Sequence, residues 1–292
     1  MKNKYQDNLK KLSKKVSDAI DATMDSQQFK DYLSTIAKFY QYSFHNQLLI
    51  ASQKPNATRV AGYRAWQTKF DRQVQKGAKS IAIFGHPQKI EREVELNDGS
   101  KEIEERIWWP IVHVFDISDT EGDPLPDLDR TKIKDDSDNA NGLINTLIKV
   151  VLENGIEYKE VEQIDGAYAN TNALGAFSPA DNMIQLVTGN GASKGELFKT
   201  LAHEIGHAFY KDLFTRRHEG HSYASEECVV ETSAMIIASR FGLDLAPYDV
   251  SYVAGWSKGD KKLYQAGLEK ATQLASNIIE KFIKVKENEL TK

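Results

Sequence analysis

Apolar positions recur every three to four residues in the first fifty residues and again over residues 266–285. This period places the apolar side chains on one face of a helix. We therefore expect two helices between about residues 5 and 51, the second continuing or restarting at Phe44, and one amphipathic helix near the C-terminus. The two N-terminal stripes are Leu9, Leu12, Val16 and Ile20, then Phe29, Leu33, Ile36 and Phe39.

Short apolar runs and a turn signal indicate strands in the next part of the chain. Two charged segments flank residues 97–100 (Asn-Asp-Gly-Ser), a sequence typical of a hairpin turn. We therefore expect an N-terminal domain, residues 1–118, in which helices precede a small antiparallel sheet. The expected strands cover residues 80–84, 89–96, 101–107 and 108–115.

An acidic, turn-rich segment at residues 119–140 is interpreted as a linker, although it could instead fold back on a basic domain. Beyond it, helical and strand patterns form a second domain, residues 141–292. Ser193 and Glu196 form a capping box at the start of one helix. The expected class is α+β in two domains. The second domain is expected to hold helices over residues 142–151, 196–212, 223–241 and 266–285, and strands over residues 156–161 and 182–187.

The strongest chemical signal is the motif His203-Glu204-Ile205-Gly206-His207, which lies inside an expected helix. Residues four apart on a helix share one face and lie about 6 Å apart along the axis, so the two imidazoles can bind one metal ion. Zn²⁺ suits them, because imidazole nitrogen is an ordinary zinc ligand and a catalytic zinc takes three protein ligands plus water. Glu204 can accept a proton from that water as the catalytic general base.

A third ligand should come from a second helix, and Glu227 is favoured for this role. Glu231 follows it by one helical turn and can hold a ligand histidine through the second ring nitrogen. Glu226, His218 and His221 remain alternatives to Glu227. A closed structural zinc usually takes four Cys or His ligands, and too few cluster here, so an open, catalytic type of site is favoured.

Peptide hydrolysis also needs a donor that stabilises the oxyanion of the tetrahedral intermediate. Tyr223, His221 and His218 are candidates, although each residue type is more often structural. The strand at residues 182–187 is a candidate edge on which a peptide substrate could add as a further strand, and its alternative is an ordinary sheet strand.

Cationic and aromatic residues interleave over residues 59–79. Cations neutralise phosphates and aromatic faces stack on unpaired bases, a combination used on single-stranded nucleic acid. The alternative is that Trp66 and Phe70, four residues apart, form the buried face of a short helix with the charges in solvent. The candidate DNA-binding residues are Arg59, Tyr63, Arg64, Trp66, Lys69, Arg72, Lys76 and Lys79.

The charge distribution favours the nucleic-acid interpretation. Residues 1–90 carry 16 Lys and Arg against 6 Asp and Glu, whereas residues 91–140 carry 6 against 16. A basic N-terminal domain attracts polyanions. The chain has one cysteine, no apolar run long enough to cross a membrane and no signal-peptide pattern, so we expect a cytoplasmic protein without membrane contact.

Two resemblances extend this picture. The ligand motif followed by Glu227 and Glu231 resembles the gluzincin arrangement of thermolysin-like metallopeptidases, which implies two His ligands, a base, a Glu ligand and a carboxylate behind a ligand histidine. The whole chain resembles the ArdC-type antirestriction proteins of plasmids and phages. The matching stretches are residues 46–49, 60–67, 74–77 and 223–231, and at residues 70–72 the chain has Phe-Asp-Arg where that family is expected to have Leu-Gly-Arg.

The ArdC resemblance implies a single-stranded-DNA-binding domain joined to a zincin-like metallopeptidase domain, in a mobile-element protein that shields incoming DNA from restriction. The expected partners are single-stranded DNA and a protein substrate of unknown identity, and the expected cofactor is Zn²⁺. Two alternatives remain. The chain could be a non-catalytic DNA-protecting protein with a structural or vestigial metal site, or a protease that cleaves a repressor.

Overall fold

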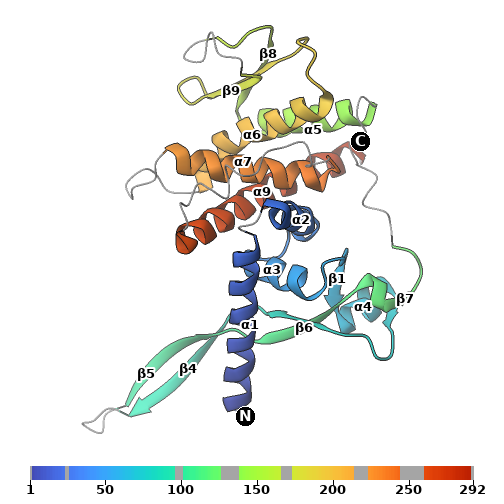
Figure 1. Ribbon diagram of the computed structural model, residues 1–292, viewed down its shortest axis with the longest axis vertical. Coiled ribbons are helices and arrows are strands. Elements are labelled where there is room, and N and C mark those ends of the chain that lie inside the picture. Colours follow the sequence, from blue (N-terminus) through green and yellow to red (C-terminus); the bar gives the residue numbers. More distant parts are fainter. Residues whose placement is uncertain are drawn as a thin grey trace. The chain divides into compact units, whose positions relative to one another are not determined.

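The computed structural model describes residues 2–23, 26–95, 101–125, 138–165, 173–213, 223–243 and 260–290. Contacts along the backbone divide the chain into two units, whose elements are labelled in Figure 1. The N-terminal unit comprises residues 1–19 and 45–125, and the C-terminal unit comprises residues 20–44 and 126–292. None of the described helices has an apolar stretch of the length needed to span a bilayer. The predicted class, α+β in two parts, is confirmed.

The N-terminal unit contains a three-stranded antiparallel sheet of order β1-β6-β3, a β4–β5 hairpin and a β2–β7 pair. One face of the three-stranded sheet is buried, because alternate residues Ile81, Ile83 and Val114 point into the core. The elements are α1 (Lys2–Ala22), α3 (Phe44–Gln53), β1 (Val60–Gly62), α4 (Tyr63–Phe70), β2 (Arg72–Val74), β3 (Ile81–Phe84), β4 (Gln88–Glu95), β5 (Lys101–Trp108), β6 (Ile111–Asp116), the 3-10 turn η2 (Ile117–Asp119) and β7 (Thr120–Gly122).

Two side-chain amides from α3 occupy the outer edge of β3. Asn46 Nδ2 donates to the carbonyl of Phe84 at 2.8 Å, and the Phe84 N–H donates back to Asn46 Oδ1 at 2.9 Å. Gln53 makes the same pair of bonds with the backbone of Ala82, at 2.9 and 3.2 Å. The edge of the sheet is therefore satisfied by α3 and does not offer its backbone to another strand.

The turn between α4 and β2 shows how this chain accommodates its departure from the ArdC-type pattern. Asp71 adopts the left-handed conformation (φ 51°, ψ 42°), which glycine occupies at lower cost. Arg72 then donates to Thr120 Oγ1 at 2.8 Å and to the carbonyl of Thr120 at 3.0 Å, as well as to the carbonyls of Gly122 and Asp123. The aspartate therefore keeps the turn, and Arg72 links β2 to β7.

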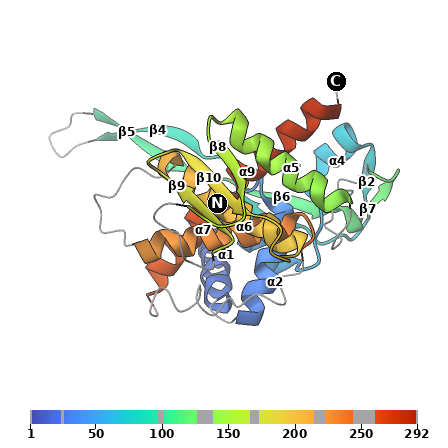
Figure 2. The ribbon, with the colours of Figure 1, turned by 90° about the horizontal axis from the view of Figure 1, so that it is seen from above.

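The C-terminal unit combines a helical core with a small mixed sheet of order β8-β10-β9. Helices α6, α7 and α9 pack against one another, and Figure 2 shows the sheet lying over α6. The elements are α2 (Ser26–Ile36), the 3-10 turn η1 (Ala37–Phe39), α5 (Asp138–Glu153), β8 (Glu157–Val161), β9 (Gly175–Ser178), β10 (Met183–Val187), α6 (Lys194–Leu213), α7 (Tyr223–Arg240) and α9 (Lys261–Leu290).

The candidate substrate edge at residues 182–187 is wrong. This strand, β10, is the central strand of the sheet, parallel to β8 on one side and antiparallel to β9 on the other. The edge beside α6 is β9, which the sequence pattern did not predict because residues 175–178 (Gly-Ala-Phe-Ser) show no clear alternation. β9 is joined to β10 by the four residues 179–182, whereas β8 comes from an earlier part of the chain.

The division into units differs from the predicted domain boundaries in two respects. Residues 20–44 belong to the C-terminal unit, where the Tyr264 hydroxyl donates to the carbonyl of Thr23 at 2.7 Å and Ser276 Oγ donates to the carbonyl of Tyr40 at 2.7 Å. Strand β7 lies inside the predicted linker and pairs with β2 in the N-terminal unit. Because of these long-range hydrogen bonds, the boundary between the two units differs from the predicted domain boundary at residue 118. The remaining linker residues 126–137 lie outside the described residues.

Candidate functional site

Helix α6 carries the ligand motif and starts with the predicted capping box. The Ser193 N–H donates to Glu196 Oε2 at 2.9 Å, and the Glu196 N–H donates to Ser193 Oγ at 3.2 Å. Apolar residues such as Leu201 and Ile205 are fully buried on one face of the helix. This amphipathic pattern fixes the rotation of α6 and leaves the polar motif residues on the side facing α7 and β9.

Gly206, inside the motif, allows α6 and α7 to approach closely. A Cβ atom at this position would lie 2.8 Å from Cγ1 of Val230 on α7 and 3.5 Å from Ser233 Oγ. Only glycine therefore fits this crossing without displacing a neighbour. The close approach brings Glu227, one turn before Val230 on α7, next to the two histidines of α6.

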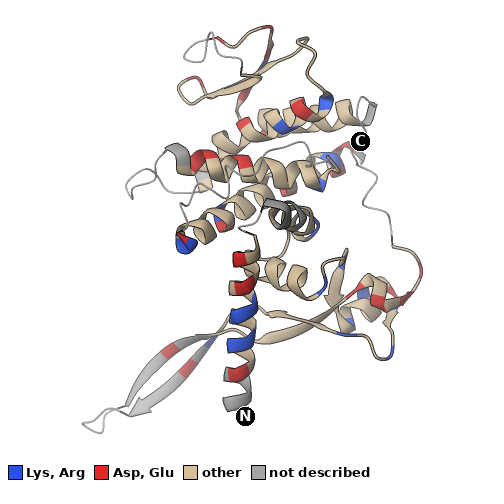
Figure 3. Cartoon of the chain, viewed as in Figure 1, with Lys and Arg blue, Asp and Glu red and all other residues tan. Residues whose placement is uncertain are grey.

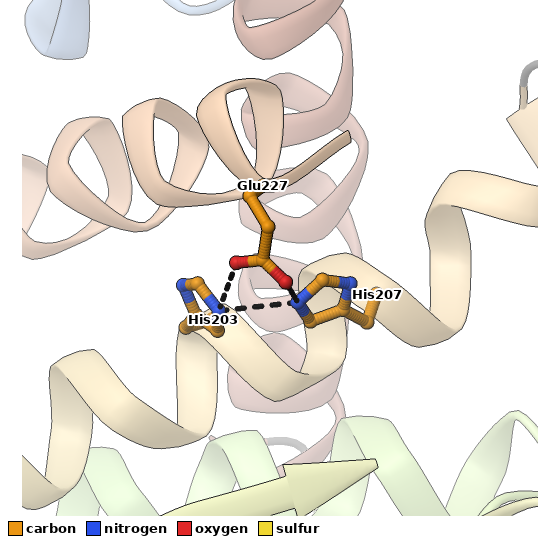
Figure 4. Close-up of side chains that lie close together, drawn as sticks. All are labelled: His203, His207 and Glu227. Carbon is orange, nitrogen blue, oxygen red and sulfur yellow. Dashed lines mark hydrogen bonds and ion pairs between the residues drawn. The ribbon is translucent and has the colours of Figure 1, made fainter. Parts of the chain in front are cut away.

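The side chains of His203, His207 and Glu227 converge on one point, as Figure 4 shows. The two Nε2 atoms lie 3.1 Å apart, and the Glu227 carboxylate oxygens lie 3.5 Å from Nε2 of His203 and 3.3 Å from Nε2 of His207. Ligands about 2.1 Å from a tetrahedral zinc ion lie about 3.4 Å from each other, so this donor set fits such an ion.

Each histidine also contacts a carboxylate through Nδ1, the ring nitrogen that faces away from Glu227. His203 Nδ1 lies 2.9 Å from Glu231 Oε2, and Lys199 Nζ contacts the second oxygen of Glu231 at 2.5 Å. His207 Nδ1 lies 3.1 Å from Glu226 Oε1. These carboxylates accept from Nδ1–H, which leaves both Nε2 atoms available for a metal.

The geometry separates the candidate ligands that the sequence left open. Glu227 faces both Nε2 atoms, whereas Glu226 lies on the far side of the His207 ring. His218 and His221 lie outside the described residues, as does the side chain of Tyr223, the other candidate oxyanion donor. Among the described residues, His203, His207 and Glu227 are the three-residue group able to hold a metal ion.

The side chain of Glu204 extends from α6 toward the edge strand β9. Its side chain is 8% exposed and accepts a hydrogen bond from the backbone N–H of Phe177. Gly175, two residues earlier on β9, makes room for it, since a Cβ there would lie 3.0 Å from Cγ of Glu204 and 2.7 Å from Cγ2 of Thr200. The carboxylate is therefore positioned jointly by α6 and by the backbone of β9.

The carboxylates around His203 and His207 favour the protonated, positively charged form of both imidazoles. Burial by itself lowers the pKa of both imidazoles, but Glu227 together with Glu231 raises the pKa of His203 to about 9, and Glu226 together with Glu227 raises that of His207 to about 9. Such clustered carboxylates favour positive charge, whether protons or a metal ion supply it.

The carboxyl groups of Glu204 on α6 and Glu231 on α7 have opposite pKa shifts. Burial raises the pKa of Glu204, which makes its carboxylate more ready to take up a proton. Burial also opposes ionisation of Glu231, but hydrogen bonds from His203 and the charge of Lys199 lower its pKa to about 2. Glu204 thus suits proton uptake, and Glu231 stays a permanent acceptor for His203.

Sequence reasoning missed Lys199 and strand β9. Lys199 stands four residues before His203 on the same helical face, so its spacing contained a usable signal. The contribution of β9 could not be found in this way, because the strand reaches Glu204 from outside the helix.

The predicted DNA-binding residues do not all reach the surface of the N-terminal unit. Trp66 is 1% exposed, and its Nε1 donates to the carbonyl of Phe115 at 2.9 Å. The half-buried Arg72 likewise donates to a backbone carbonyl, that of Thr120. Arg59 is half-buried, and Tyr63, Arg64, Lys69, Lys76 and Lys79 are exposed.

Comparison with known proteins agrees with this architecture. Residues 6–115 match the family model described as the N-terminal domain of anti-restriction factor ArdC. A relative in Bacillus anthracis, the uncharacterized protein pXO2-81, is 23% identical over 301 residues, which cover 89% of this chain and 49% of the relative. The chain therefore spans about half the length of that relative.

Solved structures of the antirestriction ArdC protein from plasmid R388 are also similar. The metal-free structure matches with a TM-score of 0.53 and 20% identity, over 83% of this chain and 86% of that one. The Mn(II)-bound structure matches with a TM-score of 0.47 and 20% identity, over 88% and 98%. Residues 6–115 therefore match the ArdC N-terminal domain family, and the chain shares the fold of the metal-free R388 ArdC structure.

Proposed function

We propose that this chain is an antirestriction-type protein of a mobile element that binds single-stranded DNA through its N-terminal unit and hydrolyses peptide bonds at the site on α6 and α7. The observation that carries the peptidase part is the convergence of His203, His207 and Glu227, with Glu204 beside them. The antirestriction part is supported by the match to the ArdC domain family.

His203, His207 and Glu227 would hold the metal, which we propose to be Zn²⁺. A divalent ion bound there supplies a lowered pKa for a coordinated water and polarisation of a substrate carbonyl. Three protein ligands leave a position open for such chemistry, as in catalytic zinc sites. Among the described residues, the donor set consists of these three side chains.

Glu204 serves as the general base. Its carboxylate is buried, its pKa is raised, and the Phe177 N–H restrains it beside the metal ligands. A carboxylate in these conditions accepts a proton from water and can pass it to the leaving amine of a peptide. The antiparallel edge strand β9, which contacts Glu204, is the structural element on which an extended peptide would align.

The substitution Glu204→Gln tests the peptidase activity. It removes the proton acceptor but preserves size and leaves the three ligands in place, so zinc stoichiometry should stay at about one per chain while cleavage of a peptide library falls by about 100-fold or more. Zinc content by mass spectrometry and peptide cleavage, with and without DNA, are the measurements. Equal cleavage by the wild type and this variant would refute the role of Glu204.

The same variant separates two candidate functions. Exposed cations in the N-terminal unit favour DNA binding independently of the metal site. If restriction protection in cells persists with Glu204→Gln, protection rests on DNA binding and not on peptide hydrolysis. If protection is lost while DNA binding is retained, hydrolysis is required for it.

A further inference from the structure

The β1-β6-β3 sheet of the N-terminal unit has two unlike faces. Ile81, Ile83 and Val114 point into the core, and each is at most 5% exposed. The opposite face carries Phe115 and Ile111, which are half-buried, and His113, which is exposed. Because side chains alternate along a strand, these three residues share this second face of β6. We call it the open face.

Aromatic rings on the open face have small neighbours. Ala61 on β1 is the register partner of Phe115, and Ala82 on β3 is the register partner of His113. Directly opposed residues on neighbouring strands lie on the same face, so these alanines flank the rings without covering them. Phe84, the partner of Ile111, adds a further half-buried ring to the same face.

Tyr63 extends the aromatic surface beyond the end of β1. Its ring is 44% exposed and meets the Phe115 ring edge to face, with the centroids 6.2 Å apart. Gln73 Nε2 donates to its hydroxyl at 2.8 Å, and Ser80 Oγ lies 3.0 Å from Nδ1 of His113. The rings are therefore held in place by their neighbours, which lowers the entropy cost of stacking a planar ligand on them.

Cations are concentrated in the segments that lead into this sheet. Residues 45–90 contain eight Lys and Arg and a single Asp, and Figure 3 shows basic residues in and around α4, with acidic residues on the neighbouring β7. Arg64, Lys69, Lys76 and Lys79 are all exposed, and the ion pairs found among the described residues involve none of them. Such cations beside an aromatic surface are complementary to a phosphate backbone with unpaired bases.

We propose that the open face, with Phe115, His113 and Tyr63 as stacking residues, binds the bases of a single-stranded nucleic acid. The inference rests on the proposed DNA binding of the N-terminal unit. It keeps Tyr63, Lys76 and Lys79 from the residues that the sequence indicated and adds Phe115 and His113 of β6. Trp66, the ring that the sequence predicted to stack on bases, is instead buried, and its Nε1 donates to the backbone carbonyl of Phe115. The bases lie on the sheet, and Lys76 and Lys79 from the segment before β3 contact phosphates.

The test compares Phe115→Leu with Phe70→Leu in the full-length protein. Phe70 is the matched control, because it is a partly exposed ring (39%) on α4, not on a strand of the sheet, and contacts Trp66. Fluorescence anisotropy should be measured against oligothymidylate, oligouridylate and a DNA duplex, each of about 20 nucleotides, at two salt concentrations. Circular dichroism and thermal unfolding verify that both variants fold.

We expect Phe115→Leu to weaken binding of oligothymidylate by about 5- to 100-fold, with a much smaller effect on the duplex. Phe70→Leu should change both by less than about 2-fold. Photocrosslinking of an iododeoxyuridine-containing strand should label Tyr63, His113 or Phe115. Tighter binding of oligouridylate with the same loss in Phe115→Leu would support the stacking surface and make RNA its ligand.

Other outcomes overturn the proposal in distinguishable ways. If the wild type binds single strands and Phe115→Leu behaves like Phe70→Leu, the open face is not the binding surface, while DNA binding by the unit stands. If the wild type binds no nucleic acid, the DNA-binding part of the proposed function fails as well. If Phe115→Leu dissociates a dimer of the wild-type chain, the face is an interface between copies.

Discussion

Nδ1 of His203 lies 2.9 Å from Oε2 of Glu231, and the other oxygen of that carboxylate contacts Lys199 Nζ at 2.5 Å. The histidine is thereby fixed in the tautomer whose Nε2 faces Glu227. The orientation of this candidate ligand thus depends on two charged residues, Glu231 from α7 and Lys199 from α6, that lie behind the imidazole and not on its Nε2 side.

Replacement of Glu231 by Gln should weaken zinc binding by about 10- to 100-fold, because the amide loses the charge that holds the imidazole. Lys199→Met should weaken it less, and Lys199→Arg should retain it. Competition with a chromophoric chelator measures the affinities. Lys194→Met, at the start of the same helix, is the control, and an equal loss there would rule out a specific role for Lys199.

The contact of Gly206 with Val230 predicts a steric effect on the site. Gly206→Ala places a methyl group 2.8 Å from Val230 Cγ1, and overpacking of this kind costs about 1–3 kcal/mol, partly offset by about 1 kcal/mol of helix propensity. We expect a lower thermal midpoint and weaker zinc binding, since α7 must move away. The double variant Gly206→Ala/Val230→Ala should recover zinc affinity, and failure to recover it would contradict this mechanism.

Zinc binding should release protons. The raised pKa values of His203 and His207, about 9 each, mean that the metal-free site carries bound protons at pH 7. Because zinc requires neutral imidazole, its apparent affinity should rise with pH up to about 9. Isothermal titration in buffers of different ionisation enthalpy should detect one to two released protons per zinc. A buffer-independent enthalpy would contradict the prediction.

The same shifts predict how the stability of the metal-free protein depends on pH. A histidine whose pKa is raised on folding stabilises the native state fully below its unfolded value of about 6.5, and this contribution is lost as pH rises through about 9. The thermal midpoint of the metal-free protein should therefore fall between these values. His203→Gln should flatten the dependence, and the zinc-loaded protein should show it less.

Gly175 on β9 provides space for the proposed base. Gly175→Ala would place its Cβ 2.7 Å from Thr200 Cγ2 and 3.0 Å from Glu204 Cγ, so Glu204 should be displaced while the three ligands stay in place. We expect peptide cleavage to fall by about 10-fold or more with zinc content unchanged. Thr200→Ser in the same chain removes the closest atom and should restore part of the activity. A parallel loss of zinc would show that the damage reaches the ligands.

Asp71 holds a left-handed conformation at the end of α4. Because a side chain makes this conformation costly, Asp71→Gly should stabilise the protein by about 0.5–1 kcal/mol, and Asp71→Ala should destabilise it by a similar amount. Chemical denaturation provides the measurement. Asp18→Gly, within the regular helix α1, is the control and should be destabilising. A neutral Asp71→Gly would show that Asp71 offsets the strain through local hydrogen bonding.

Much of the candidate metal site was predictable from the sequence because its determinants are local. The spacing of His203 and His207 on an amphipathic helix requires only helical geometry, and the capping box at Ser193 and Glu196 starts that helix at the predicted place. The spacing of Glu227 and Glu231 likewise predicted one ligand and one carboxylate behind a histidine. In the structure Glu227 lies 3.3 Å from Nε2 of His207, and Glu231 lies 2.9 Å from Nδ1 of His203.

The tertiary structure decided every feature that depends on contacts between distant segments. It placed Glu226 behind His207, brought β9 against Glu204, buried Trp66 and assigned residues 20–44 to the C-terminal unit. None of these follows from a periodic pattern. The sequence by itself determined which residues are candidates for metal chemistry, because helical spacing is a local property. Packing between elements determined which of them meet, because burial is settled only when the whole chain folds.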